Sequence, residues 1–392
     1  MEAYLVDWLN LFFRWFHVIA GVAWIGASFY FVWLDLSLRE PPQWKKEKGI
    51  KGDLWAIHGG GIYEVAKYEL EPEAMPKKLH WFKWEAYTTW LTGFALLCVM
   101  YYWGADQYLI DPSKMELTQL QAIGISLGFL VGGFVFYEAL IKSPLQKFPK
   151  VFGALLFAGL TFAAYALGEI FSDRAAYLHV GALIGSIMAG NVFFGIMPAQ
   201  RELVRAIEAG EKPDARPAQF AKLRSTHNNY FTLPLLFIMI SNHYPMTYGH
   251  EHAWLILALI SFNAAFVRHY FNLKHQGNHK PWILVVGLVF LFAIIGFMLP
   301  KPVNTDAAVV SDAAIVTISE QRCASCHAAK PTQPGFTSAP AGIALESIDE
   351  LNANKPRILQ AVKTNYMPLA NMTKMTDDER AQMIRWAQSL SN

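Results

Sequence analysis

The sequence predicts an all-α protein in which a bundle of eight membrane-spanning helices precedes a small helical domain of soluble character. Hydrophobic residues make up 54% of the 392 residues and charged residues only 16%, a balance typical of membrane proteins. Eight apolar runs reach or approach the roughly 20 residues that a helix needs to cross hydrocarbon. After residue 300 the composition turns polar. The chain therefore divides into a bundle at 1–300, a linker at 301–311 and a C-terminal domain at 312–392.

The eight predicted spans account for most of the first 300 residues. The first run is too long for the core of a signal peptide and has no A-x-A-like cleavage site near its end, so we expect it to stay as an anchor. A net charge of +2 gives no reason to expect a nucleic-acid partner, and the apolar composition implies membrane lipid instead. The predicted spans are residues 5–36, 84–103, 118–140, 151–171, 175–197, 229–246, 252–273 and 281–299.

Positive charge is distributed unevenly between the two sets of connections. The connections on one side hold 20 Lys and Arg residues, whereas those on the other side hold only Lys114 and Arg174. Cytoplasmic connections collect positive charge, and an even number of spans places both termini on the same side. We therefore expect a bacterial inner-membrane protein whose N-terminus and C-terminal domain are periplasmic. The basic connections are residues 37–83, 141–150, 198–228 and 273–281.

The C-terminal domain contains Cys323-Ala-Ser-Cys326-His327, which matches C-x-x-C-H, the attachment signature of c-type haem. Residues three apart share one face of a helix, so both thiols can reach the haem vinyl groups while His327 supplies the proximal nitrogen. A chance match or a redox dithiol is the alternative. The predicted periplasmic location favours a class I-like cytochrome c, because haem is attached to cysteine in that compartment. Cys98, alone in an apolar run, is expected to be a small buried hydrophobe.

A methionine is often the sixth ligand of such a haem iron. Met367 is the predicted ligand, because it lies in a loop-like YMPLAN stretch downstream of the attachment motif. Met372 and Met375 are expected to be loop or cover residues, and either remains an alternative ligand. After this stretch, Thr376-Asp-Asp-Glu379 reads as a capping box that starts a closing helix.

Polar and aromatic residues gather in three stretches at the predicted cytoplasmic boundary. Glu85 and His227 lie where helices begin, and because an unpaired charge in lipid is costly, we expect both to face a protein-lined cavity. Interfacial aromatic belts with snorkelling lysines are the alternative explanation. The stretches are residues 55–67, 79–90 and 224–232.

Five idiosyncratic segments are RWFHVIAGVAWIGASFYF (14–31), HGGGIYEVAKY (58–68), LHWFKWEAYTTWLTGFALL (79–97), RSTHNNYFTLPLLFIMISNHYP (224–245) and the CASCH motif. In them the chain resembles the bacterial membrane-bound urate oxidases, in which an eight-helix urate oxidase domain is fused to cytochrome c. The likeness extends over essentially the whole chain. It implies a urate oxidoreductase that hydroxylates urate to 5-hydroxyisourate and passes electrons to the cytochrome rather than directly to oxygen.

The chemistry of urate defines what such a site must offer. Urate is a planar anion at neutral pH, so the site needs a cation, amides for the lactam edges, an aromatic face and a base for the ring proton. Either His227 or Glu85 is expected to be the base. The candidate catalytic and binding residues are His227, Glu85, His80, Lys67, Arg224, Asn228, Asn229 and Trp84.

A substrate site near the cytoplasmic connections raises a problem of distance, because electrons would have to cross about 30 Å of hydrocarbon to reach a periplasmic haem. An intermediate carrier is implied, and histidines within spans are candidate ligands for a haem b. These are His17 and His179, whose surroundings form a weak repeat between the first and fifth spans, and His243 in the sixth. A packing role is the alternative for each. Without a carrier, the substrate site would lie in the periplasmic half.

We therefore expect an enzyme that donates electrons to a respiratory cytochrome c oxidase or a soluble cytochrome. The main alternative is an anchored electron-transfer subunit that serves another dehydrogenase. Clustered polar residues argue against it, because a bare anchor needs only one or two spans. A transporter with a fused redox sensor would need Gly or Pro breaks in matched helices, and Pro234 is the only proline well inside a predicted span.

Overall fold

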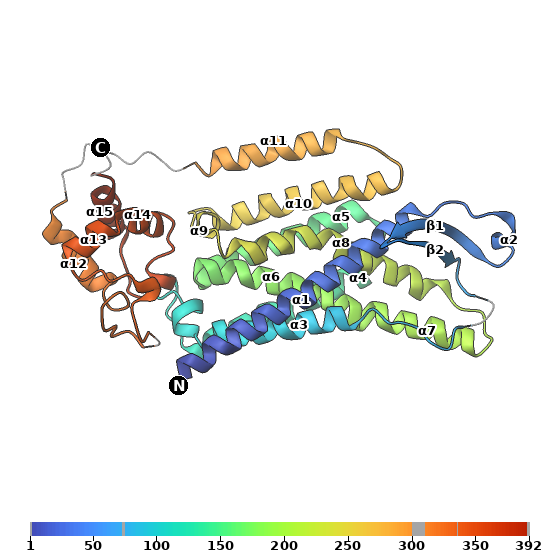
Figure 1. Ribbon diagram of the computed structural model, residues 1–392, viewed down its shortest axis with the longest axis horizontal. Coiled ribbons are helices and arrows are strands. Elements are labelled where there is room, and N and C mark those ends of the chain that lie inside the picture. Colours follow the sequence, from blue (N-terminus) through green and yellow to red (C-terminus); the bar gives the residue numbers. More distant parts are fainter. Residues whose placement is uncertain (1, 73–74, 300–309, 335, 390–392) are drawn as a thin grey trace.

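The computed structural model describes residues 2–72, 75–299, 310–334 and 336–389, and helices dominate this part of the chain. Long helices lie side by side in the middle of an elongated molecule (Figure 1). A β-hairpin lies at one end of this bundle and the C-terminal domain lies at the other. Most of the predicted linker falls outside the described residues.

Each of the eight predicted spans contains a helix. Five helical stretches are long and apolar enough to cross a membrane, namely α1, α4, α5, α10 and α6 with its continuation to residue 208, and α11 is apolar but shorter. Membrane crossing by α3 and α8 stays a prediction. The helices are α1 (Glu2–Ser37), α3 (Trp84–Leu97), α4 (Gln119–Lys142), α5 (Pro149–Ile170), α6 (Asp173–Gly190), α8 (Ala215–Ser241), α10 (Ala253–His275) and α11 (Trp282–Phe297).

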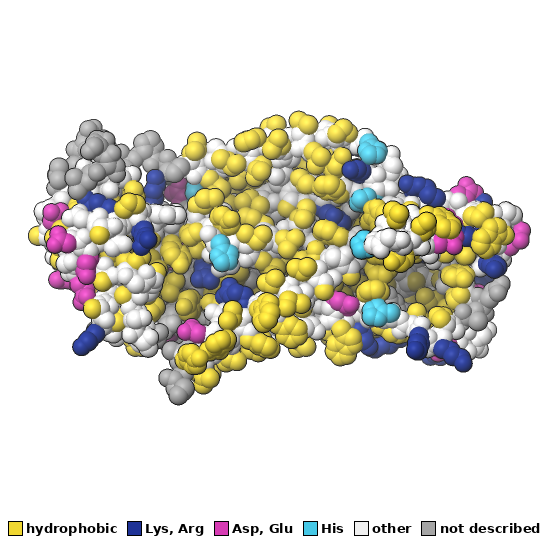
Figure 2. Space-filling model, viewed as in Figure 1, with side chains coloured by type: hydrophobic (Ala, Val, Ile, Leu, Met, Phe, Trp, Pro, Cys, Tyr) yellow, Lys and Arg dark blue, Asp and Glu magenta, His cyan; other side chains and the backbone are white. Residues whose placement is uncertain are grey.

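The outer surface of the bundle is apolar. Hydrophobic side chains cover the middle of the molecule and charged side chains gather toward its two ends (Figure 2). In α1 only 17% of the apolar window is buried, whereas 61% of that in α6 is buried. Exposed apolar surface of this extent is typical of contact with membrane lipid or with another protein. Length, composition and surface together are those of a membrane protein with α6 at its centre.

The connection after α1 contains a β-hairpin, which the all-α prediction missed. Gly59 and Gly60 form its turn, and both have positive φ, at 57° and 80°. Two glycines suit the left-handed backbone of a two-residue hairpin turn. Lys45, with 4% of its side chain exposed, pairs with Asp53 and Glu64 beneath the hairpin. The elements are α2 (Gln43–Lys46), β1 (Ile50–His58) and β2 (Gly61–Tyr68), and the two strands pair antiparallel.

The C-terminal domain is a small helical unit with its own core. Ile315, Leu351 and Met383 are fully buried in it. The predicted capping box is confirmed, because the Thr376 hydroxyl accepts from the Glu379 amide and the Glu379 carboxylate accepts from the Thr376 amide. The helices are α12 (Asp312–Arg322), α13 (Ile348–Ala353), α14 (Lys355–Lys363) and α15 (Asp377–Gln388).

Specific contacts hold the C-terminal domain against the end of the bundle. Asn365 Nδ2 donates to the Gly249 carbonyl at 3.0 Å, and Lys374 pairs with Glu116 at 3.2 Å. The chains approach so closely that a Cβ added to Gly249 would lie 1.8 Å from the Thr364 carbonyl oxygen. The short helix α9 (Pro245–Tyr248) ends beside this contact. The domain is therefore docked on the bundle and does not only follow it in sequence.

Acidification should destabilise α15. Burial would raise the pKa of Glu379, but hydrogen bonds from Arg322 and Thr376 hold that pKa below its ordinary value of 4.5. A carboxyl with a lowered pKa contributes stability that is complete above its unfolded-state pKa and is lost as pH falls through the folded-state value. We expect amide protection in α15, measured by hydrogen exchange, to fall in that acidic window. Glu379→Gln keeps a capping side chain but should remove this pH dependence, and an unchanged dependence would contradict the assignment.

Candidate functional site

A buried polar network joins α4, α8 and the π-helical segment η4 (Asn191–Ile196) that continues α6. Arg224 lies at its centre, with 1% of the residue exposed. Its guanidinium makes a bidentate pair with Glu138, with Nη2 3.0 Å from Oε2, and Nη1 donates to Asn191 Oδ1 at 2.8 Å. A buried charge is costly unless it is paired and hydrogen-bonded. The pair therefore ties α8 to α4.

Asn191 extends this network to a tyrosine and a histidine. Its Nδ2 donates to the Tyr137 hydroxyl at 2.9 Å and to Asn228 Oδ1 at 2.8 Å. The Tyr137 oxygen lies 2.9 Å from Nδ1 of His227. The tautomer of His227 that gives the Tyr137 proton a partner accepts that proton at Nδ1 and carries its own proton on Nε2. His227 also stacks on Phe152 with ring centroids 4.7 Å apart.

Local sequence features make this network possible. Arg224 and Asn228 are four residues apart on α8 and therefore share one face of the helix. The chain loosens from α-helix to π-helix at Asn191, a change that often accompanies functional sites. Gly195 leaves the space that the arginine side chain fills, because a Cβ there would come within 2.2 Å of Arg224 Cδ.

Three predicted site residues have their described contacts outside this network. Lys67 pairs with Asp35 at the end of α1. His80 is exposed and packs edge-on against Phe82 at 4.5 Å between ring centroids. Glu85 lies in the first turn of α3, and its Oε2 is buried without a hydrogen-bond partner among the described residues. Of the two candidate bases, Glu85 thus has a free acceptor atom, whereas Nδ1 of His227 is occupied.

Asn229 and Trp84 also lie apart from Arg224. Asn229 Oδ1 accepts from Arg268 Nε at 3.1 Å and from Asn272 Nδ2 at 2.8 Å, so this amide ties α8 to α10. Trp84 is 64% exposed, with the Lys83 ammonium 5.7 Å from its ring centroid. Such an arrangement is typical of an interfacial aromatic residue.

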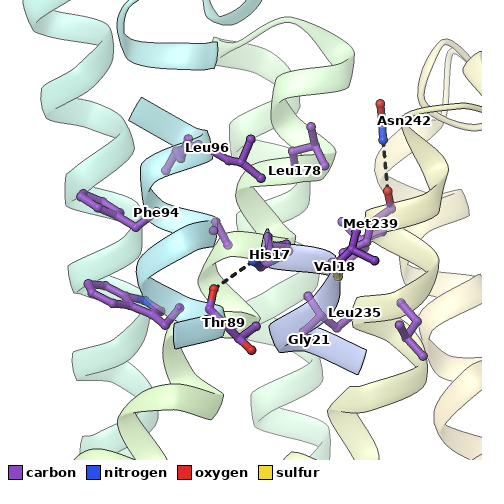
Figure 3. Close-up of a pocket in the computed structure, with 18 of the residues that line it drawn as sticks. His17, Val18, Gly21, Thr89, Phe94, Leu96, Leu178, Leu235, Met239 and Asn242 are labelled. Atoms are coloured by element: carbon purple, nitrogen blue, oxygen red, sulfur yellow. Dashed lines mark hydrogen bonds between the residues drawn. The ribbon is translucent and has the colours of Figure 1, made fainter. Parts of the chain in front are cut away.

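An apolar cavity of about 520 Å³ lies between α1, α3, α6 and α8. His17 projects from α1 toward α3 within it, and the figure draws its hydrogen bond to Thr89 (Figure 3). Met188 and Thr232 line this cavity and also bind Asn228, since the Asn228 amide donates to Met188 O and the Thr232 hydroxyl donates to Asn228 O. The cavity and the polar network are therefore neighbours. Its volume lies within the range of cofactor and ligand sites.

The three candidate haem b histidines have different surroundings. His17 and His243 both line the apolar cavity, and His179 does not. His179 is 1% exposed, with Nε2 2.7 Å from the Ser126 hydroxyl and Nδ1 2.7 Å from the Ala175 carbonyl. Both ring nitrogens of His179 are thus occupied, as expected for a packing histidine. The weak repeat that paired His17 with His179 does not extend to their environments.

The C-x-x-C-H motif forms a turn directly after α12. The His327 amide donates to the Cys323 carbonyl at 2.8 Å, and both cysteines are free thiols. His327 Nδ1 donates to the Ile343 carbonyl at 2.9 Å, which leaves Nε2 as the nitrogen with a lone pair. Burial raises the pKa of the Cys323 thiol to about 11, whereas reactive dithiols need a lowered pKa. The free Nε2 of His327 beside two unpaired thiols is compatible with the attachment of a haem.

The candidate methionines differ in burial. Met367 is half-buried in the loop after α14, while Met375 is 4% exposed and packs in the core of the domain. Met372 is half-buried in the same loop region. Core packing leaves Met375 a poorer candidate for the sixth ligand than Met367. Among the described residues, no group of three or more His, Cys, Asp or Glu side chains is placed to hold a separate metal ion.

A second cavity of about 550 Å³ lies where the C-terminal domain meets the bundle. Its lining is polar and includes the cations Arg174, Arg380 and Lys114, the side chains of Tyr366 and Asn365, and the carboxylates Asp111, Glu169, Asp173, Glu251 and Asp377. Cations, an amide and an aromatic side chain are groups that a planar anion such as urate requires, whereas the carboxylates would repel it. This cavity corresponds to the alternative location in the periplasmic half of the bundle.

Sequence reasoning found one side of the buried network and missed the other. Arg224, His227 and Asn228 stand within five residues on one helix, so their local polarity was visible. Glu138 and Asn191 belong to two other apolar helices. Glu138 could have been noticed in the sequence, because a carboxylate within a predicted span is rare and is usually functional or paired.

The fold defines a helical membrane protein with a buried polar network, an apolar cavity and a docked C-terminal domain. More specifically, the chain belongs to the urate oxidase N-terminal family, whose family model matches residues 3–299. The match ends where the bundle ends and leaves the C-terminal domain outside. No curated protein and no solved structure matches the chain.

Removal of the Glu138 carboxylate should destabilise the bundle. Glu138→Gln leaves the buried Arg224 charge uncompensated, and we expect a loss of about 3 kcal/mol, as for other broken buried pairs. Thermal unfolding of the purified protein in detergent would measure it. Arg216→Ala, which removes an 88% exposed arginine from the same helix as Arg224, is the control and should change little. Equal midpoints for the two variants would show that the pair does not stabilise the bundle.

Proposed function

We propose that the protein oxidises urate to 5-hydroxyisourate and passes the electrons through a haem c in its C-terminal domain to the respiratory chain. The observation that carries the proposal is the family match to the bundle, and it is supported by a C-x-x-C-H motif whose histidine binds the Ile343 carbonyl through Nδ1. In this proposal Cys323 and Cys326 hold the haem covalently. His327 and Met367 supply its iron ligands.

The reaction requires a one-electron acceptor that acts twice. Urate and water give 5-hydroxyisourate, two protons and two electrons, so no oxygen is consumed in the step. A bound haem supplies one-electron acceptance, and a respiratory cytochrome c oxidase or a soluble cytochrome then removes each electron. With both termini on the periplasmic side of the inner membrane, the C-terminal domain faces such acceptors.

The bundle residues in the proposed substrate site have separate tasks. Glu85 takes the ring proton of urate, because its free carboxylate oxygen is buried and has no partner to compete. His227 presents a proton on Nε2 and acts as a hydrogen-bond donor to the purine. Arg224 and Asn228 position His227 through Asn191 and Tyr137, because both side chains bind Asn191. In this proposal His80 and Lys67 lie along the path by which urate enters the site.

Urate should reduce the haem of the purified protein. We expect the α-band absorbance of reduced haem c to appear when urate is added anaerobically to oxidised protein. Absence of reduction in protein with full haem content would instead favour the anchored electron-transfer subunit. The full chain is the right material for this measurement, because the two domains are docked.

Substitution of the proposed base should separate turnover from haem content. Glu85→Gln should lower urate turnover by at least about 10²-fold, the usual contribution of a general base, and leave the haem c spectrum intact. Glu69→Gln makes the same change at a hairpin carboxylate that is 77% exposed and should leave turnover unchanged. If Glu85→Gln retains turnover while Lys114→Met or Tyr366→Phe loses it, the substrate binds in the polar cavity between the domains.

A further inference from the structure

The apolar cavity between α1, α3, α6 and α8 contains positive charge without a matching carboxylate. Its lining is almost entirely hydrophobic, yet it includes Arg14 and Arg174 and no Asp or Glu. Arg14 binds only neutral atoms among the described residues, at Asn10 Oδ1 and Met100 Sδ, and Arg174 donates to Asn242 Oδ1 at 3.0 Å. Arg174 Nε is buried without a partner. Arg174 also lines the polar cavity, which contains carboxylates, but within the apolar cavity both guanidinium groups have only neutral partners. Such groups favour an anionic ligand with an apolar body.

His17 is prepared to bind a metal in this cavity. Its Nδ1 lies 2.9 Å from the Thr89 carbonyl oxygen and 3.2 Å from the Thr92 hydroxyl. A carbonyl can only accept, so Nδ1 carries the proton and Nε2 keeps a lone pair, which is the state of a metal-binding imidazole. Gly93 permits the ring to lie against α3, because a Cβ there would be 2.8 Å from His17 Cε1.

His243 supplies a second imidazole from another helix. It follows the end of α8, lines the same cavity and is exposed, and its ring makes no hydrogen bond with the described residues. Two imidazoles, each with a nitrogen that makes no hydrogen bond with the described residues, and two guanidinium groups that bind only neutral atoms thus share a cavity of cofactor size.

We propose that this cavity binds a haem b, with His17 and His243 as iron ligands and Arg14 and Arg174 as partners of the two propionates. A haem combines an apolar planar body, two carboxylates and an iron that takes imidazole ligands. A lipid tail or a quinone would leave the two arginines unpaired, and urate is too polar for this lining. Because His179 has no free ring nitrogen, the ligand pair differs from the one that the sequence repeat suggested.

The role of this haem b in electron transfer rests on the proposed function, whereas its binding in the cavity does not. The cavity adjoins the His227 network through Met188 and Thr232 at one side. At the other side of the cavity, His243 precedes α9. Gly249, which follows α9, accepts a hydrogen bond from Asn365, two residues before Met367. A carrier in this position divides the roughly 30 Å of hydrocarbon into shorter electron transfers. Haem b and haem c together would hold the two electrons that one urate releases, one on each iron.

The first test is a pyridine haemochrome of the purified full-length chain. We expect both haem c and haem b, with haem b alone extracted by acidified acetone because it is not covalently attached. His17→Gly and His243→Gly should each lower haem b and leave haem c unchanged, and His279→Gly at an exposed position is the matched control. Added imidazole should restore a low-spin haem spectrum in the His17→Gly variant, which a merely unfolded protein would not show.

Arg14→Gln and Arg174→Gln test the propionate contacts. Each should weaken retention of haem b during purification, while Arg216→Gln should not. Protein with full haem c but no haem b would overturn the proposal, as would a haem b content that is indifferent to both histidines. These measurements need no urate, so they can succeed if the proposed function fails. If the proposed function and the haem b proposal are both correct, one molecule of urate per chain should reduce both haems. A chain with haem c alone would need only half a molecule of urate for full reduction.

Discussion

Polar groups inside an apolar bundle have to satisfy one another, and the rest of this structure depends on that constraint. Arg224 is the extreme case, since its guanidinium is completely buried. Its pairing with Glu138 and Asn191 fixes how α4, α8 and the segment after α6 pack. The π-helical turn at Asn191 and the absence of a side chain at Gly195 are local departures from ideal helix that this pairing requires. The position of His227 then follows from that packing through Tyr137.

Much of the fold could be predicted from the sequence, because hydropathy and positive charge report directly on the membrane. Helices lie at all eight predicted span positions, and the basic connection after α1 and the C-terminal domain lie at opposite ends of the molecule. The hairpin was missed, although Gly59 and Gly60 between alternating residues are a hairpin signal. Its strands are largely exposed, so the core gives them no hydrophobic run to detect.

The sites were predictable only where their residues lie close together in the chain. The C-x-x-C-H motif and the Arg224–Asn228 cluster are local, and each could be read from one stretch of sequence. Glu138 and Asn191, the partners of Arg224, lie on other helices, and His243, the proposed second ligand beside His17, lies just after the end of α8. Which residues meet depends on packing that a single sequence does not display. His179 shows the converse, since the sequence around it resembles that around His17 while both of its ring nitrogens bind Ser126 and Ala175.

If the C-terminal domain carries electrons as proposed, its docking limits how it can deliver them. Asn365 and Lys374 bind it to the same end of the bundle at two separate places, and Gly249 meets Thr364 with no space between them. A domain held in this way does not swing on its linker to search for an acceptor. Under the proposed function an acceptor would instead have to diffuse to it, so the rate of electron delivery would depend on how often a mobile partner collides with the outer surface of a stationary domain.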